Sequence, residues 1–219
     1  MTSAAPEANA ESIAEAIRCA SFRAAMMTVT GAVKRWMVTS ALVNCYILTG
    51  GRSERMGQSK TELFLARVVA AATPLFEEVV AVQRQGAAPL SIRTIHESAH
   101  EDDGPVFGVI RALEDADGSA FILAVDYPLV TTSALAELRR RFLASSALMA
   151  VPVWRGIPQP LCAGYRAEVL SLIRDRVGEG KLDLVGLMRD AAAATFPFDG
   201  RELMNVNTPD ELAKAERVE

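Results

Sequence analysis

The most informative segment of the chain reads Val43-Asn44-Cys45-Tyr46-Ile47-Leu48-Thr49-Gly50-Gly51-Arg52-Ser53-Glu54-Arg55-Met56-Gly57-Gln58-Ser59-Lys60. Its first part, Val43–Leu48, is apolar and predicts a buried strand, and a helix is predicted to follow the loop. Gly50 and Gly51 let the backbone adopt conformations closed to other residues, so successive N–H groups can surround an anion. Three cations fall within nine residues of this loop: Arg52, Arg55 and Lys60. The segment therefore predicts a phosphate-binding loop between a strand and a helix.

Two standard phosphate-binding motifs do not fit this loop. No Gly-Lys-Ser/Thr closes it, so it is not a Walker A loop, and it lacks the Gly-x-Gly-x-x-Gly dinucleotide fingerprint. A surface turn with solvated charges would account for Gly50 and Gly51 alone. It does not account for the whole string directly after a buried strand.

Short apolar runs alternate with helical patterns from residue 41 onward. Strands are predicted at Val43–Leu48, Val79–Gln83, Ile92–Ile95, Phe121–Val125, Leu148–Pro152, Leu161–Tyr165 and Thr195–Phe198. Helices are predicted at Thr61–Ala72, Val106–Glu114, Ser133–Ala144, Ala167–Arg176, Leu182–Arg189 and Asp210–Arg217. Apolar strands alternating with helices are typical of a mostly parallel sheet covered on both faces. The turn signal at Trp154–Pro158 adds a hairpin, so we predict a three-layer, Rossmann-like α/β fold with one antiparallel strand.

The bulk composition fits a cytoplasmic protein with one large domain. The chain has 219 residues, of which 50% are hydrophobic, enough for a substantial core. Its net charge of −4 argues against nucleic acid as the main partner. The apolar-leaning stretch Trp36–Gly51 is too short for a membrane span. The cysteines, Cys19, Cys45 and Cys162, lie far apart without a C-x-x-C spacing, which is typical of a reducing compartment.

Residues 1–40 differ from the rest and are assigned to an N-terminal extension, with the main domain at 41–219. The extension is rich in Ala, Ser and Thr and is expected to be disordered or to form one amphipathic helix. Ile13, Ile17, Ala20 and Ala24 would share a face of that helix, which leaves a docking role open. Met26, Met27 or Met37 could each be the true first residue.

One motif is set aside. His96-Glu97-Ser98-Ala99-His100 matches the H-E-x-x-H string of zinc metalloproteases, whose chemistry needs both histidines one turn apart on a helix. A strand is predicted to run into this string, and Gly104-Pro105 would end any helix almost at once. No further histidine exists in the chain.

Four strings together resemble the molybdenum cofactor guanylyltransferase (MobA) family. Leu48–Lys60 resembles its L-A-G-G-x-S-x-R-M-G-x-D-K signature. Asp103–Gly108 is similar to its G-P-L-A-G segment, Ala124–Leu129 to its C-D-x-P-L segment, and Asn205–Leu212 to its N-x-N-T-P-E-D-L ending. Their order and spacing fit over residues 43–219. The resemblance implies a nucleotidyltransferase that joins GTP and molybdopterin into molybdopterin guanine dinucleotide and releases pyrophosphate.

The resemblance also implies roles for individual residues. GTP would be bound by Leu48, Thr49, Gly50, Gly51 and Lys60, by Glu97 where the family carries an Asp, and by Lys181 in the family's mobile loop. Lys60 and Arg55 would neutralise charge during the reaction. Asn205 and Asn207 would lie near the pterin, and molybdoenzyme maturation proteins are further partners to expect. As an alternative, Asn205 and Asn207 are turn-forming residues before Pro209, and Lys181 is a solvated loop residue.

Asp126 is the predicted Mg²⁺ ligand. It ends an apolar strand, where ligands collect in α/β sheets, and a carboxylate suits a hard cation that also binds phosphate oxygens. Its alternative role, capping the next helix, is disfavoured because Thr131 and Thr132 lie closer to that helix.

Two groups of alternatives remain open. The chain departs from the family at Thr49, Ser59, Glu97 and Val125, and Ser59 removes a carboxylate beside the phosphate site. One alternative is cytidylyl transfer to the same pterin, or nucleotidyl transfer to another small phosphate. The other is a binding or regulatory protein that keeps the nucleotide fold without turnover.

Overall fold

The structure is a computed structural model that describes residues 43–49, 60–97, 104–206 and 208–217, without the side chains of residues 60–63 and 209. All of these residues belong to one compact unit, residues 41–219. The expectations for residues 1–40 lie outside the described residues. Within the described ranges, no helix has the length and apolar character needed to cross a membrane.

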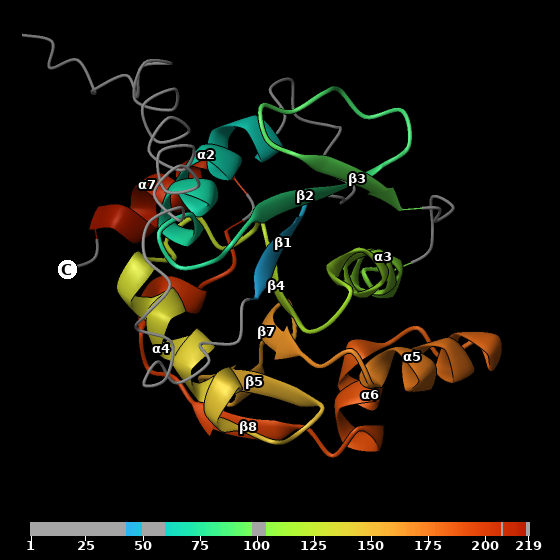
Figure 1. The fold of residues 1–219 in the computed structure, drawn as a ribbon. Coiled ribbons are helices and arrows are strands. Elements are labelled where there is room, and N and C mark those ends of the chain that lie inside the picture. Colours follow the sequence, from blue (N-terminus) through green and yellow to red (C-terminus); the bar gives the residue numbers. More distant parts are fainter. Residues whose placement is uncertain (1–42, 50–59, 98–103, 207, 218–219) are drawn as a thin grey trace, which may run out of the picture. The chain divides into compact units, whose positions relative to one another are not determined.

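The centre of this unit is one eight-stranded sheet (Figure 1). Its strands are β1 (Asn44–Leu48), β2 (Val79–Arg84), β3 (Thr94–Glu97), β4 (Ala120–Ala124), β5 (Met149–Trp154), β6 (Ile157–Pro158), β7 (Cys162–Tyr165) and β8 (Ala194–Pro197). The order is β3-β2-β1-β4-β7-β5-β6, and β8 pairs with β5. Strands β1 to β4 are parallel, as are β5 and β8, whereas β6 and β7 pair with antiparallel neighbours. The predicted α/β class with a mostly parallel sheet is confirmed, but the described part has two antiparallel strands, β6 and β7, where one was predicted.

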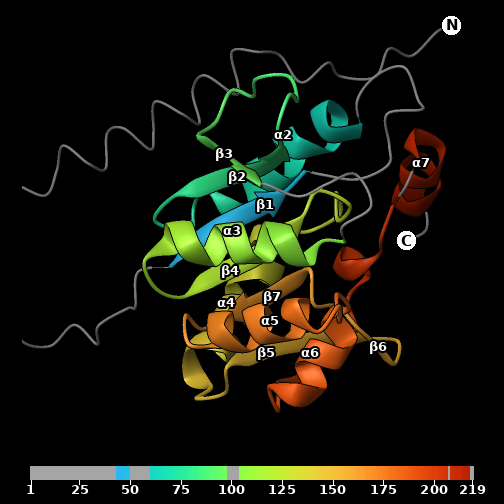
Figure 2. The same ribbon diagram turned by 90° about the vertical axis from the view of Figure 1, so that its right-hand side faces the viewer.

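Six helices of the described part cover the two faces of the sheet. They are α2 (Lys60–Ala72), α3 (Val106–Ala116), α4 (Thr132–Ala144), α5 (Val169–Gly178), α6 (Leu184–Asp190) and α7 (Pro209–Arg217), and a short 3₁₀ turn, η2 (Arg201–Leu203), precedes α7. One buried apolar cluster joins the sheet to α2, α4 and α7, and a second joins its other face to α3, α5 and α6. Figure 2 shows α3 and α5 in front of the sheet. This is the predicted three-layer arrangement.

The hairpin predicted at Trp154–Pro158 joins β5 and β6. Trp154 pairs with Ile157 across a two-residue turn. Both turn residues have positive φ, 49° at Arg155 and 78° at Gly156, as a type I′ turn requires.

The third strand lies two residues beyond its predicted position of Ile92–Ile95. Parallel pairing with β2 fixes this shift, because Ala81 lies opposite Thr94 and Arg84 lies opposite Glu97. Ile92 instead packs partly buried from the preceding loop. His96 and Glu97 thus belong to a strand, where adjacent side chains point to opposite faces, whereas the zinc motif needs its first histidine on a helix. The last three residues of that motif lie outside the described residues.

A glycine in β7 is required by the packing of α4. An ideal Cβ placed on Gly164 would lie 2.1 Å from Cγ of Phe142, whose ring is fully buried. We therefore expect Gly164→Ala to lower the free energy of unfolding by about 3 kcal/mol, the upper part of the range for overpacked cores. Urea denaturation measures this. Gly178→Ala, at the end of α5 with open space around it, is the matched control and should be close to neutral. Equal stabilities of the two variants would contradict the prediction.

Candidate nucleotide-binding site

The carboxyl ends of three parallel strands are joined at the start of the glycine-rich loop. The Thr49 amide and hydroxyl both donate to the carbonyl oxygen of Val82, in the second half of β2, at 3.0 and 2.9 Å. On the other side, the amide of Val125 donates to the carbonyl oxygen of Leu48 at 3.1 Å. These bonds fix the direction in which the chain leaves β1 for the loop.

The predicted metal ligand, Asp126, lies in a turn directly after β4. It is half-buried, and the turn is closed by the amide of Tyr127, which donates to the carbonyl oxygen of Ala124 at 3.4 Å. The next helix is capped by Thr131, whose hydroxyl accepts from the amide of Ala134. Asp126 is therefore not the cap of α4, and its carboxylate stays at the carboxyl edge of the sheet.

The C-terminal asparagine segment docks on this turn. The amide of Val206 donates to the backbone oxygen of Asp126 at 2.9 Å, and the Val206 side chain is fully buried in the cluster beneath α2 and α4. Asn205 is exposed beside it, and Asn207 lies outside the described residues. Two motifs about 80 residues apart in the sequence are thus brought together, as the prediction of a common site requires.

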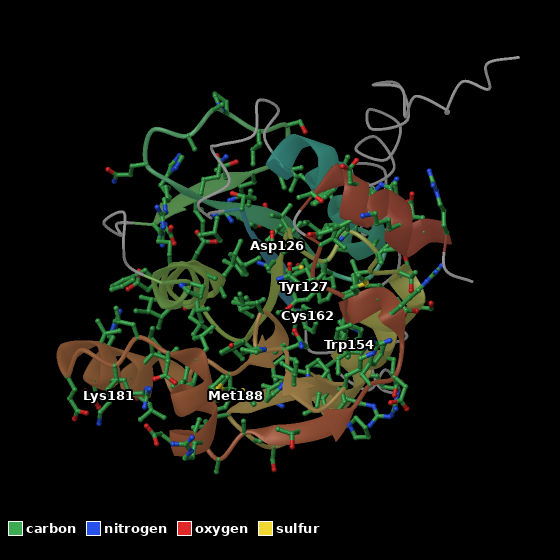
Figure 3. The ribbon with its side chains drawn as sticks, turned by 180° about the vertical axis from the view of Figure 1, so that it is seen from behind. Asp126, Tyr127, Trp154, Cys162, Lys181 and Met188 are labelled. Carbon is green, nitrogen blue, oxygen red and sulfur yellow. The ribbon has the colours of Figure 1, made fainter. Side chains whose placement is uncertain are left out.

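A buried glutamine that the sequence reasoning missed supports the Asp126 turn. The hydroxyl of Tyr127 donates to Oε1 of Gln159 at 2.8 Å, and Nε2 of Gln159 donates to the carbonyl oxygen of Ile157 at 3.0 Å. One side-chain amide therefore links the turn after β4 to the β5–β6 hairpin. Figure 3 shows Tyr127 between Asp126 and Cys162. The available signal was a single polar residue between Pro158 and Pro160, next to an apolar strand.

Glu97 ends β3 and lies buried against the first turn of α3. A Cβ placed on Gly108 would lie 3.0 Å from Oε2 of Glu97 and 3.1 Å from Cδ2 of Leu48. The absence of a side chain at Gly108 therefore lets α3 approach the ends of β1 and β3 together. Nε of Arg84, at the end of β2, lies 3.5 Å from Oε1 of Glu97. Burial raises the pKa of the Glu97 carboxyl, and the nearby positive charge of Arg84 acts in the opposite direction.

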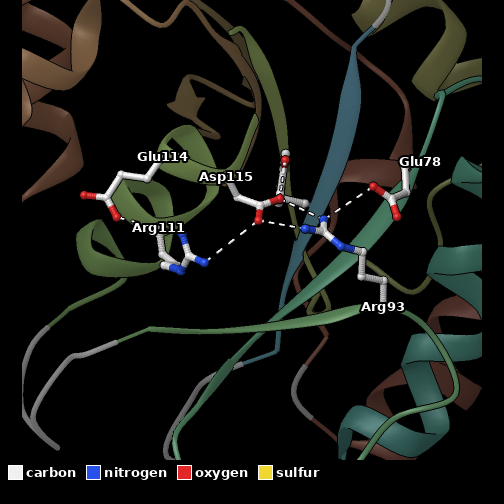
Figure 4. Close-up of polar contacts among 6 residues, drawn as sticks. Glu78, Arg93, Arg111, Glu114 and Asp115 are labelled. Carbon is white, nitrogen blue, oxygen red and sulfur yellow. Dashed lines mark hydrogen bonds and ion pairs between the residues drawn. The ribbon is translucent and has the colours of Figure 1, made fainter. Parts of the chain in front are cut away.

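The other end of α3 is held by an ion-pair network (Figure 4). Arg93 binds Asp115 through two hydrogen bonds of 2.8 Å, and the hydroxyl of Tyr46 donates to Oδ2 of Asp115 at 2.9 Å. Burial and the hydrogen bond to Asp115 contribute to raising the pKa of Tyr46 to about 12, so the phenol remains a donor at neutral pH. The helix that carries Gly108 is thus anchored to β1 and to the β2–β3 connection.

Lys181 lies apart from these groups. It is exposed on the α5–α6 connection, where Nζ donates to Oε2 of Glu179 at 2.7 Å. Figure 3 shows it well separated from Asp126. The connection is braced by the buried guanidinium of Arg176, which binds Asp183 and Asp190. The structure does not bring Lys181 to the Asp126 turn, and its predicted phosphate contact stays a prediction.

The remaining predicted phosphate ligands are only partly covered by the structure. Gly50, Gly51 and Arg55 lie outside the described residues, and so does the side chain of Lys60. The backbone of Lys60 begins α2, as the loop-to-helix prediction requires.

The donor set at Asp126 fits Mg²⁺ as an ion shared with a substrate. In the part of the chain that the structure describes, no group of three or more His, Cys, Asp or Glu side chains could hold a metal alone. Mg²⁺ is usually bound by one or two carboxylates together with phosphate oxygens and water, so one carboxylate together with the phosphates of a nucleotide meets that requirement.

Comparison with known proteins agrees with this geometry. Residues 45–193 match the family model described as MobA-like NTP transferase domain. A Mycobacterium tuberculosis H37Rv protein named "Probable molybdenum cofactor guanylyltransferase" is 29% identical over 179 residues, which cover 74% of this chain and 87% of the relative. A Bacillus licheniformis protein of the same name is 27% identical over 190 residues, covering 78% and 94%.

A solved structure shows the same fold. The crystal structure of molybdopterin-guanine dinucleotide biosynthesis protein A from Archaeoglobus fulgidus superimposes with a TM-score of 0.67 at 23% identity, covering 80% of this chain and 98% of that one. Since the family model spans well over half of the sequence, the chain belongs to the MobA-like NTP transferase family and is a nucleotidyltransferase.

Proposed function

We propose that the chain transfers GMP from GTP to the terminal phosphate of molybdopterin, giving molybdopterin guanine dinucleotide and pyrophosphate. The observation that carries the proposal is the bond between the Val206 amide and the backbone oxygen of Asp126. It holds the asparagine segment, which the resemblance assigns to the pterin, against the turn assigned to the nucleotide and its metal. Relatives named molybdenum cofactor guanylyltransferases support the same substrates. We place the reaction in the cytoplasm.

The proposed reaction forms a bond between the pterin phosphate and the α-phosphorus of GTP, and breaks the bond from that phosphorus to pyrophosphate. A terminal phosphate with a second pKa near 6 is largely dianionic at neutral pH. The nucleophile therefore needs no general base, and the chain has mainly to orient two anions and neutralise their charge.

The chain's own groups divide this task. Backbone N–H groups at Gly50 and Gly51 surround the phosphates, and Lys60 and Arg55 supply cations. Asp126 would hold Mg²⁺, which when bound neutralises charge on the triphosphate and the leaving pyrophosphate. Asn205 and Asn207 orient the pterin through their amides. Glu97 accepts hydrogen bonds from the nucleoside part of GTP.

A pyrophosphate-release assay tests the proposal and separates the alternatives. Release that requires GTP, Mg²⁺ and molybdopterin together is the expected result. Release with CTP in place of GTP would show a cytidylyltransferase instead. Nucleotide binding without release under any combination would show a relative that has lost turnover, and release with another phosphorylated acceptor alone would replace the pterin.

Nucleotide choice is also testable without the acceptor. We expect GTP to raise the melting temperature more than ATP, CTP or UTP at the same concentration. A ligand at a hundredfold excess over its Kd stabilises by about 2.7 kcal/mol, which for a domain of this size is a shift of roughly 5–11 °C. Differential scanning fluorimetry with Mg²⁺ measures the shift. Equal shifts for all four triphosphates would remove the preference for guanine.

A further inference from the structure

Arg84 and Glu97 form a pair at the carboxyl edge. The resemblance assigns Glu97 to the nucleotide but gives Arg84 no role. They lie directly opposite each other in the parallel register of β2 and β3. Nε of Arg84 is 3.5 Å from Oε1 of Glu97, and the Glu97 side chain is only 10% exposed whereas that of Arg84 is 33% exposed. A buried carboxylate thus faces a partly exposed cation at the end of two adjacent strands.

The surroundings of Glu97 fix the direction of its carboxylate. Gly108 of α3 lies against Oε2, and Leu48 of β1 closes the same side. On β3 itself, His96 is exposed and points to the opposite face. The charged residues of α3 are engaged elsewhere: Asp115 binds Arg93 and lies near Arg111, while Glu114 binds Arg174. Among the described residues, the ion pair to Glu97 therefore comes from β2.

The position of the pair suits the base end of a bound nucleotide. Adjacent strands lie 4.7–4.9 Å apart, so the ends of β1 and β3 are about 10 Å apart across β2. In the proposed function the phosphates bind after β1, and Glu97 and Arg84 lie at the same carboxyl edge, at the ends of β3 and β2. At this spacing the pair lies within the length of a bound nucleotide.

We propose that Arg84 is a positioning residue for guanine recognition, which holds Glu97 as an oriented carboxylate that accepts hydrogen bonds from the ring N–H and the exocyclic amino group of the base. This proposal rests on the proposed function, since it assumes that GTP is the nucleotide. An ionised carboxylate only accepts hydrogen bonds, and its two oxygens match the two adjacent donors on this edge of guanine. A protonated carboxyl would place its own O–H donor against an N–H donor of guanine.

The electrostatics give the proposal a pH dependence with a definite sign. Burial raises the pKa of Glu97, and Arg84 opposes that rise. Guanine binding needs the ionised form, so binding is present above the pKa of Glu97 and is lost as the pH falls through it. Without Arg84 the pKa rises further, and the loss of binding should begin at a higher pH.

Titration calorimetry with GTP and with inosine triphosphate, which lacks the 2-amino group, tests this in the full chain with Mg²⁺ and no acceptor. The wild type should bind GTP roughly tenfold more tightly than inosine triphosphate, since hydrogen bonds to charged groups contribute at least that factor. Arg84→Met should weaken the binding of GTP roughly tenfold and reduce the preference for GTP over inosine triphosphate. It should also move the loss of GTP binding to higher pH. Arg84→Lys should retain most of the affinity.

A double-mutant cycle and a matched control complete the design. In a Glu97→Gln background, Arg84→Met should have little further effect on GTP affinity, because the two residues act through one interaction. Arg174→Met removes an arginine from another ion pair, with Glu114, and should leave GTP binding unchanged.

Two results would overturn the role of Arg84 while leaving the proposed function intact. One is an Arg84→Met variant that binds GTP as tightly as the wild type. The other is an Arg84→Met substitution that weakens the binding of GTP and of inosine triphosphate equally at every pH, in both the wild-type and the Glu97→Gln backgrounds. That result would make Arg84 a phosphate ligand. Failure of the wild type to bind GTP would overturn the proposed function and this inference with it.

Discussion

Asp126→Asn should lower the rate of Mg²⁺-dependent guanylyl transfer by about 10²–10³-fold while the fold persists. The substitution keeps the shape of the side chain and removes its charge, so a bound Mg²⁺ would lose its carboxylate ligand. The bond that docks the asparagine segment uses the backbone oxygen of Asp126, and the substitution retains that oxygen. Steady-state pyrophosphate release over a range of Mg²⁺ concentrations measures the loss, and the concentration for half-maximal rate should rise.

Asp175→Asn is the matched control for this variant. Asp175 is exposed on α5, on the far side of the sheet from the asparagine segment. Asp175→Asn changes the net charge by the same amount as Asp126→Asn, and we expect it to leave the rate of guanylyl transfer unchanged. If Asp126→Asn turns over at the rate of this control, Asp126 has a structural role and the metal lies elsewhere.

Periodicity predicted most of the fold because the interior strands are almost wholly apolar. β4, Ala120–Ala124, is buried at every position, and its flanking turn residues fixed its bounds to within one residue. β3 was displaced because its four residues alternate between buried and exposed, so pairing with β2 outweighs the local apolar signal. Tertiary pairing of this kind is absent from the local pattern.

The candidate site was predictable where it depends on motifs and hidden where it depends on pairing across the sheet. Asp126 follows from one strand ending in a carboxylate. The contact between its turn and Val206 joins segments that no local pattern connects, and only the shared resemblance pointed to it. Gln159 and Arg84 gave weaker signals: Gln159 is one polar residue between two prolines, and Arg84 stands between two glutamines after an apolar run. Their partners, Tyr127 and Glu97, become evident only once the strands are placed side by side.

Substitution of Lys60 distinguishes most clearly between a residue that acts in catalysis and a residue that only begins a helix. It begins α2 at the end of the glycine-rich loop. A cation there opposes the helix macrodipole, which favours negative charge at the N-terminus. Its presence is therefore unfavourable for the isolated helix by roughly 0.3–1 kcal/mol, and favourable when an anion such as a triphosphate is bound.

Lys60→Ala should accordingly lower kcat/KM for GTP by about 10²–10³-fold, the typical cost of one preorganised electrostatic contact, and leave the stability of the nucleotide-free chain unchanged or slightly increased. Pyrophosphate release and urea denaturation measure the two effects. Lys214→Ala, which removes an exposed lysine from the last turn of α7, is the matched control and should leave kcat/KM unchanged. A helix-start lysine without a ligand would give the same stability change with unaltered kinetics. A normal kcat/KM in the Lys60→Ala variant would therefore contradict the proposal that Lys60 and the glycine-rich loop bind the phosphates of GTP.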